Sequence, residues 1–426
     1  MALLAYFKPG EPFLTQYLVN AKVLSSDQVY QEIYPIWTYA QLALLLTYGV
    51  CAEYLSGGKW MVVLGSSSLL LEPVLLVVLT SFAGLQLIEI VSASGAAGMI
   101  IFTSFIYRVL PEGFFQRATS FVRAAFLLGT VSSSLLGQLL LDQASVPITL
   151  LFWIQSCVMV LCLAFAISLP SDFALRPPSP PRSPAAELSA LRDLWGSIAA
   201  LALWMIVSLA VHTLVLTYYQ VLFFEINSAA NYNGYVQASS YACAALCTLL
   251  PGLFYRKIAF PSPLAVSLWL VGAALASCLM LIAMGLFRTL VPAYVLFFCY
   301  HCLFEFSMTV ASYQIALTLH GRFDTVKHSP DSSRVAIVFS WNTIVSIVFQ
   351  VLLQFIIGKG VLDLTPAQYF VGFGSVLGVL GVVLVCAIVW IQHRHQPVSD
   401  QRLISEGEGE TFISEVASEE GSIQNN

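Results

Sequence analysis

A small set of ionisable side chains lies inside long apolar stretches of this sequence, and these side chains are the first candidates for chemistry. Such a group near the centre of a lipid bilayer costs several kcal/mol unless it faces water or a partner. Four carboxylates outnumber one certain cation, so we expect a cavity lined by the set to prefer a cationic or neutral solute. The set comprises Lys8, Glu11, Glu72, Glu89, His212, His301 and Glu305.

His301 and Glu305 are four residues apart, which places them on the same face of a helix. A hydrogen-bonded pair there would stabilise both groups or move a proton. A structural pair with no part in function fits the same spacing.

The remaining acids differ in their sequence context. Glu72 stands next to Pro73, and we expect it to pair with a neighbouring helix. Glu11 and Glu89 are the acids that we expect to face a cavity. Glu53 precedes Ser-Gly-Gly-Lys at the end of an apolar stretch, where we predict a hinge or gate contact.

Aromatic side chains supply the second part of a site for a flat organic cation, because a ring face attracts positive charge and stacks on heterocycles. The segment Tyr34-Pro-Ile-Trp37-Thr-Tyr39 is the best placed for this role. Trp and Tyr are also common anchors at the membrane surface, and that alternative stays open. Further candidates on the same grounds are Phe102, Tyr218, Tyr219, Tyr232 and Trp341.

The elements that position these groups are membrane-spanning helices. The chain is 58% hydrophobic and only 10% charged, whereas a soluble domain carries about 25% charged residues. A spanning helix needs about 20 mostly apolar residues. Eleven runs of this length are present, at residues 35–55, 60–79, 85–110, 118–141, 148–169, 194–216, 235–254, 263–287, 290–319, 335–357 and 367–391.

A twelfth, shortened span is expected at residues 1–18, where Lys8-Pro-Gly-Glu11-Pro breaks the apolar run. A charged n-region and a small-residue cleavage site are both missing, so we do not interpret this start as a signal peptide. The sequence therefore predicts an all-α polytopic membrane protein whose first helix is truncated.

The distribution of basic residues predicts the orientation and the domains. With a cytoplasmic N-terminus, only Lys22, Arg288 and Lys359 of the 18 Lys and Arg lie in extracellular loops. Both termini are therefore expected to be cytoplasmic. We predict a six-helix half at 1–169, a Pro- and Ser-rich cytoplasmic linker at 170–193, a second six-helix half at 194–392 and a disordered acidic tail at 393–426. Six plus six helices are typical of the major facilitator fold, whose site lies between the halves.

Several other classes of function lack support in the sequence. The nine cysteines fall within or beside apolar runs, as small packing residues do. Cys299-Tyr-His-Cys302 superficially resembles a metal or redox pair, but it lacks the soluble context that such pairs need. A nucleophile–base set and a Gly-rich phosphate loop are also missing outside the apolar runs. We expect no enzyme activity, no cofactor, no metal and no nucleic-acid partner.

Motifs along nearly the whole chain resemble the reduced folate carrier family, whose animal members move folates or thiamine. Lys8-Pro-Gly-Glu11-Pro-Phe-Leu-Thr15 is similar to the family's first helix, and Tyr34-Pro-Ile-Trp37-Thr-Tyr39 to the second helix of its thiamine-transporting members. Further similar segments begin at Phe115, Tyr232, Ala311 and Ala336. The resemblance implies the major facilitator fold.

The resemblance also bears on the substrate. Folate-transporting members place basic residues at three cavity positions that carry Met99, His301 and Gln350 here, which make a poor site for a dicarboxylate. Thiamine transporters match this chain at Glu11, Trp37 and Gln350, but they have glutamate at the position of Met99. The residues and the resemblance together favour a substrate site built from Glu11, Tyr34, Trp37, Glu89, Met99, Phe102, His301 and Gln350, with Glu53, Arg123 and Glu305 in gating or coupling.

Three hypotheses follow. The first is a plasma-membrane carrier of a water-soluble vitamin, thiamine or a related cationic heterocycle, that works by alternating access with a coupled proton or a counter-transported anion. The second is a folate-type anion carrier, which requires Arg123 or Lys8 to face the cavity. The third is a receptor or scaffold that kept the transporter fold without transport.

Overall fold

The computed structural model describes residues 1–54, 57–109, 115–170, 184–229, 232–254, 263–323, 332–358 and 361–395. In this part of the chain every regular element is helical. The long helices are α4 (Tyr34–Tyr54), α5 (Gly57–Val78), α6 (Phe82–Val109), α7 (Phe115–Ala144), α8 (Ile148–Ser168), α9 (Pro184–Ile226), α10 (Asn233–Phe254), α11 (Pro263–Leu286), α12 (Leu290–Phe323), α13 (Ser332–Ile357) and α14 (Pro366–His395).

Each of the eleven runs expected to span the membrane falls on one of these helices, which confirms the all-α polytopic prediction. Within the described residues, nine helices are long and apolar enough to cross a membrane, all of them among α5 to α9 and α11 to α14. The helix ends differ from the expected ones by a few residues, with one larger exception at α9.

The first segment is broken, as its sequence predicts. It consists of α1 (Ala2–Ala5), a single 3-10 turn η1 (Glu11–Phe13) and α2 (Leu14–Asn20). Pro9 and Pro12 lack the N–H that a continuous helix needs. Gly10 lies so close to the side chain of Phe152 that an added Cβ would be 2.4 Å from its ring. Any larger residue at position 10 would therefore require the ring of Phe152 on α8 to shift.

Two short elements connect this segment to α4. They are α3 (Ser26–Gln28) and the π-helical turn η2 (Val29–Ile33). Ser25 and Gln28 form a reciprocal capping box at the start of α3. Lys22 donates to the carbonyls of Val77 and Leu79, at 3.0 and 2.7 Å, and so closes the end of α5.

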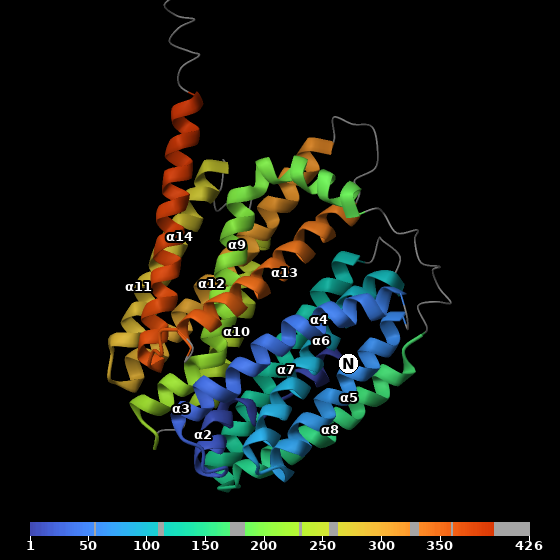
Figure 1. Cartoon of the computed structure of the whole chain (residues 1–426), viewed down its shortest axis with the longest axis vertical. Coiled ribbons are helices and arrows are strands. Elements are labelled where there is room, and N and C mark those ends of the chain that lie inside the picture. Colours follow the sequence, from blue (N-terminus) through green and yellow to red (C-terminus); the bar gives the residue numbers. More distant parts are fainter. Residues whose placement is uncertain are drawn as a thin grey trace, which may run out of the picture.

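The helices form two bundles, α1 to α8 and α9 to α14, which incline toward each other in Figure 1. Small residues allow close helix packing, as is common in membranes. A Cβ on Gly65 of α5 would lie 2.5 Å from the Cα of Gly98 of α6. In the second bundle, α11 packs along α14 and α10 along α12.

The halves touch mainly at the end that carries α2 and α3, and Figure 1 shows them converging there. Gln31 of η2 donates to Asp363, between α13 and α14, at 2.8 Å. The rings of Tyr30 and Tyr369 meet edge to face with centroids 5.6 Å apart. The opposite end, where α8 ends and α9 begins, is called the linker end below.

One predicted boundary does not coincide with a helix end. The linker was expected at 170–193, but α9 begins at Pro184, so residues 184–193 are helical. The segment Ala-Ala-Glu-Leu-Ser-Ala-Leu is rich in strong helix formers, and that local preference overrides the Pro- and Ser-rich context before it. Residues 171–183 lie outside the described residues. So does the predicted tail beyond His395, where α14 ends.

Candidate functional site

A cavity of about 330 Å³ lies between the two halves, lined by residues of both. Its N-terminal wall comes from the broken first segment and from α4, α5, α6 and α7, and its C-terminal wall from α9 and α10. The N-terminal wall includes Ala5, Tyr6, Lys8, Glu11, Leu14, Tyr34, Trp37, Leu69, Glu72, Leu76, Ile88, Glu89, Ser92, Ala96, Met99, Thr130 and Ser133. The C-terminal wall includes Thr213, Leu216, Thr217, Tyr219, Gln220, Gln237 and Tyr241.

Lys8 is neutralised by the acids around it. Its Nζ donates to both carboxylate oxygens of Glu72, at 3.2 and 3.1 Å. The carboxylate of Glu11 lies 3.8 Å from the same nitrogen. The side chain of Glu72 is only 10% exposed, so this ion pair is shielded from water. Glu72 was expected to pair with a neighbouring helix, and it does form a pair, but its partner Lys8 lies in the break between α1 and η1.

Glu89 lies in the cavity wall without such a partner. Its half-buried side chain comes from α6. Within the described part of the chain, neither a hydrogen bond nor an ion pair engages its carboxylate. Three carboxyl groups, from Glu11, Glu72 and Glu89, line this wall beside the single ammonium of Lys8. The arrangement is suited to hold a cationic group, since an opposite charge inside a low-dielectric site is strongly favoured.

Aromatic side chains surround the acids. Tyr34 and Trp37 of α4 line the cavity as predicted, and the Tyr34 hydroxyl shares a hydrogen bond of 2.7 Å with Thr15. Tyr219 and Tyr241 approach from the other half. Aromatic side chains thus lie on both sides of the cavity, as stacking on a flat solute requires.

Five of the eight predicted substrate residues line the cavity. They are Glu11, Tyr34, Trp37, Glu89 and Met99. Sequence reasoning missed the neutral polar residues Gln220, Gln237 and Thr130, and the aromatic residues Tyr6 and Tyr241. Gln220 and Gln237 carried a signal, because a glutamine inside an apolar helix needs a hydrogen-bond partner.

Three predicted substrate residues are not part of the cavity wall in this structure. Phe102 is 7% exposed and packs in the core of the N-terminal half. Gln350 is 2% exposed and donates to Thr38 at 3.4 Å, which joins α13 to α4. His301 is 1% exposed and packs against the rings of Tyr241 and His212. In each case the helix turns the side chain into a packed interface.

The expected pair of His301 and Glu305 is not formed. Glu305 instead accepts a hydrogen bond of 2.6 Å from Arg123 of α7. A guanidinium is a stronger partner for a carboxylate than a neutral imidazole, which explains the choice. Among the described residues, the ring nitrogens of His301 have no hydrogen-bond partner.

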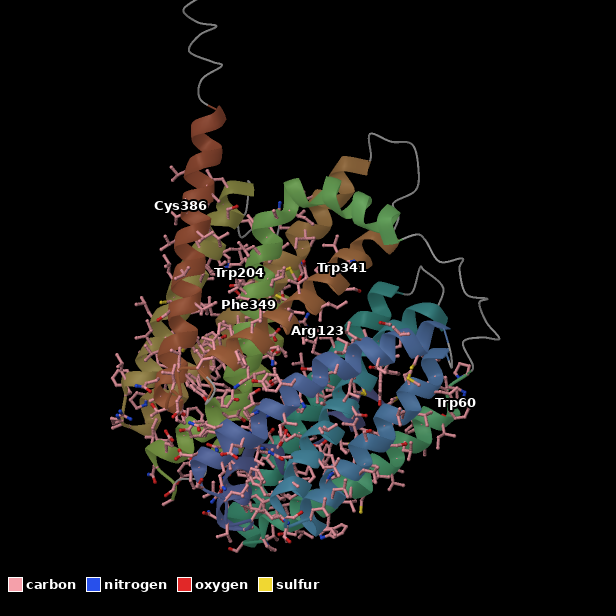
Figure 2. All side chains as sticks on the ribbon, viewed as in Figure 1. Trp60, Arg123, Trp204, Trp341, Phe349 and Cys386 are labelled. Atoms are coloured by element: carbon pink, nitrogen blue, oxygen red, sulfur yellow. The ribbon has the colours of Figure 1, made fainter. Side chains whose placement is uncertain are left out.

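The pair of Arg123 and Glu305 connects α7 of one half to α12 of the other, and Figure 2 shows Arg123 between the two bundles. This position agrees with the gating role predicted for both residues, which stays a prediction. Glu53, the other predicted gate residue, lies near the end of α4, and its side chain is outside the described part of the structure.

The cysteines include one cluster that the sequence did not indicate. The sulfur atoms of Cys243 and Cys247 on α10 and Cys302 on α12 lie within 4.8 Å of one another. Cys299 is exposed and does not belong to the cluster. The thiols are near enough to share a metal ion, although their expected role as packing residues fits the α10–α12 contact equally well.

Comparison with known proteins identifies the chain's relatives. The family model described as "Reduced folate carrier" matches residues 2–174 and 187–372. A folate-like transporter of Dictyostelium discoideum is 30% identical over 87% of this chain, which spans 62% of that protein's length. Thiamine transporter 1 of Homo sapiens is 26% identical, covering 90% of this chain and 86% of that protein. Reduced folate transporter of Rattus norvegicus is also 26% identical, covering 94% and 84%.

Solved structures show the same fold at low sequence identity. A POT family transporter in complex with a thioalcohol-conjugated peptide has a TM-score of 0.66 at 12% identity, covering 90% of this chain and 93% of that one. A D-xylose-proton symporter has a TM-score of 0.63 at 12% identity, covering 90% and 94%. The relatives and the structural neighbours are transporters, not enzymes. This chain has the major facilitator fold and belongs to the reduced folate carrier family.

Proposed function

We propose that this chain carries a cationic, heteroaromatic vitamin of the thiamine type across the plasma membrane. The observation that carries the proposal is the contrast between Glu89 and Lys8. The cavity's only ammonium within the described residues is held by Glu72 and Glu11, whereas the Glu89 carboxylate faces the cavity without a protein partner. A cationic ring between Trp37 and Tyr241 would find both a counter-charge and stacking faces.

A folate-type anion carrier is the alternative, and the names of several relatives favour it. That function requires Lys8 or Arg123 to offer its charge to the substrate. Both cations are already bound to carboxylates, Lys8 to Glu72 and Arg123 to Glu305. An incoming dianion would have to displace these partners and to approach Glu89 as well. The charge pattern therefore supports the cation over the anion.

We propose alternating access as the mechanism, with both termini in the cytoplasm. The halves are in contact at the α2–α3 end, where Gln31 bonds to Asp363. With the orientation that the basic residues favour, this end is extracellular and the linker end is cytoplasmic. The structure would then represent the state closed to the outside, and rocking of the two halves would close the other end.

Uptake of labelled thiamine and labelled folate by cells that produce the full chain tests the proposal, with a Glu89→Gln variant beside it. We expect thiamine to enter and the variant to lose at least about 90% of the uptake, because a buried charge–charge contact contributes about 1.4 kcal/mol or more. The matched control is Glu225→Gln, which neutralises an exposed acid of α9 outside the cavity wall. Entry of folate alone would replace the cation carrier with the anion carrier.

Coupling to a proton or to a counter-transported anion is also proposed. The proton is supported by the presence of Glu11, Glu72 and Glu89 in one cavity wall. A proton bound to one of these carboxylates would compete with a bound cation. A rate of thiamine uptake that does not change with external pH would remove the proton. Binding of thiamine without any uptake would instead identify a receptor that kept the fold.

A further inference from the structure

The break in the first segment separates two backbone groups that would be partners in a continuous helix. These are the carbonyl of Glu11 and the amide of Thr15, four residues apart. In an α-helix the second would donate to the first. Here η1 ends at Phe13 and the carbonyl accepts from Leu14 instead, in a 3-10 turn. The Thr15 amide therefore needs another acceptor, because lipid and apolar side chains offer none.

Gln220 of the opposite half is inserted between these two groups. Its Oε1 accepts from the Thr15 amide at 3.4 Å, and its Nε2 donates to the Glu11 carbonyl at 2.8 Å. The side chain is 6% exposed, so water does not compete for these bonds. One side-chain amide from α9 thus replaces one helical hydrogen bond of the first segment.

A second amide from the same half engages the break. Asn233, at the start of α10, donates to the carbonyl of Pro12 at 3.2 Å. Tyr294 of α12 donates to Asn233 at 3.1 Å and fixes its orientation. The C-terminal half therefore supplies the partners that the broken backbone of the N-terminal half lacks.

We propose that Gln220 is a positioning residue that couples the relative placement of the two halves to the position of Glu11 in the cavity. While the halves touch at the α2–α3 end, Gln220 keeps the segment broken and holds the backbone of Glu11. When they separate there, Gln220 withdraws with α9, and the Thr15 amide bonds to the freed Glu11 carbonyl. That step lengthens α2 by about one turn and moves the Glu11 carboxylate relative to Lys8 and Glu89.

The inference rests on the alternating-access part of the proposed function but not on the identity of the solute. Its first test therefore needs no substrate. Hydrogen exchange of backbone amides is measured by mass spectrometry on the purified full chain in lipid nanodiscs, for the wild type and for Gln220→Leu. We expect the peptide that contains Thr15 to exchange about tenfold faster in the variant, which corresponds to the loss of one hydrogen bond. While the halves touch, Asn233 still holds the Pro12 carbonyl, so the segment stays broken and the Thr15 amide loses Gln220 without gaining the Glu11 carbonyl.

The matched control is Gln354→Leu. Gln354 is a buried glutamine of α13 in the same half, and it accepts from Tyr218 at 2.8 Å without touching the first segment. This variant should leave the Thr15 peptide unchanged. Equal acceleration in both variants, or none in Gln220→Leu, would overturn the proposal. Gln220→Asn keeps the amide but shortens its reach, so it should behave like Gln220→Leu and serves if the leucine variant does not fold.

A second measurement separates positioning from mere support of the fold. In cells that take up labelled thiamine, Gln220→Leu should lower the maximal rate about tenfold while changing the half-saturating concentration less than threefold. A change confined to the half-saturating concentration would place Gln220 in substrate binding and contradict the positioning role. If thiamine is not transported at all, the proposed function fails, whereas the exchange test still decides the role of Gln220.

Discussion

The two halves contribute different chemistry to the same cavity. Among the described residues, all the charged side chains of the cavity wall come from the N-terminal half, namely Lys8, Glu11, Glu72 and Glu89. The C-terminal wall offers neutral amides, hydroxyls and rings, such as those of Gln220 and Tyr241. One half therefore sets the sign of the charge that can bind. The other half supplies stacking faces and hydrogen bonds to the broken backbone. A carrier of dianions would need cations on at least one wall that are free of carboxylates.

The largest effect is expected when the ammonium is removed from the N-terminal wall. Lys8→Met leaves the buried carboxylate of Glu72 without its counter-ion. Because an uncompensated buried charge is costly, we expect the variant to lose about 3 kcal/mol of stability, measured by thermal unfolding in detergent. The double variant Lys8→Met/Glu72→Gln removes the stranded charge and should recover most of the loss. A single variant as stable as the wild type would show that the pair is solvated.

Two aromatic residues of the N-terminal half test how much ring faces contribute to substrate binding. Trp37 lines the cavity, and Phe102 is packed in the core. Trp37→Leu should raise the half-saturating concentration of labelled thiamine about tenfold, the size of a well-formed cation–π contact. Phe102→Leu, a change of similar shape in a packed site, should alter it less than about twofold. The reverse order would return Phe102 to the substrate site.

The smallest effect is expected at the contact between the halves. The guanidinium of Arg123 is 51% exposed, so its pair with Glu305 should contribute less than about 1 kcal/mol to stability. Because the pair connects the halves, Arg123→Gln should change the maximal uptake rate by up to about fivefold. The charge-swapped variant Arg123→Glu/Glu305→Arg should restore the rate. Wild-type rates in the single variant would exclude a gating role.

Much of this architecture could be predicted from the sequence. The spanning runs and the break at Lys8-Pro-Gly-Glu11-Pro follow from length, apolarity and backbone chemistry, and they needed no tertiary information. Glu89 and Trp37 were found because a charge or an indole inside the membrane demands a reason. These signals depend on residue type alone.

The other site residues could not be predicted, because the sequence does not say which face of a helix is turned toward the cavity. Helices α12 and α13 carry buried polar residues, such as Gln350 and Gln354 on α13, but the sequence does not tell whether such a residue faces the cavity or a neighbouring helix. His301 and Gln350 were placed in the site by resemblance, but packing turns His301 toward Tyr241 and Gln350 toward Thr38. Gln220 was missed for the complementary reason, since its partners are backbone atoms of a segment about 200 residues away.

Direct binding measured by isothermal titration calorimetry on the purified full chain tests the central claim, that Glu89 makes this a cavity for a cation. Thiamine should bind the wild type and bind Glu89→Gln at least about tenfold more weakly, while folate should bind neither. Folate binding to both proteins, with thiamine binding unchanged by the substitution, would contradict the account.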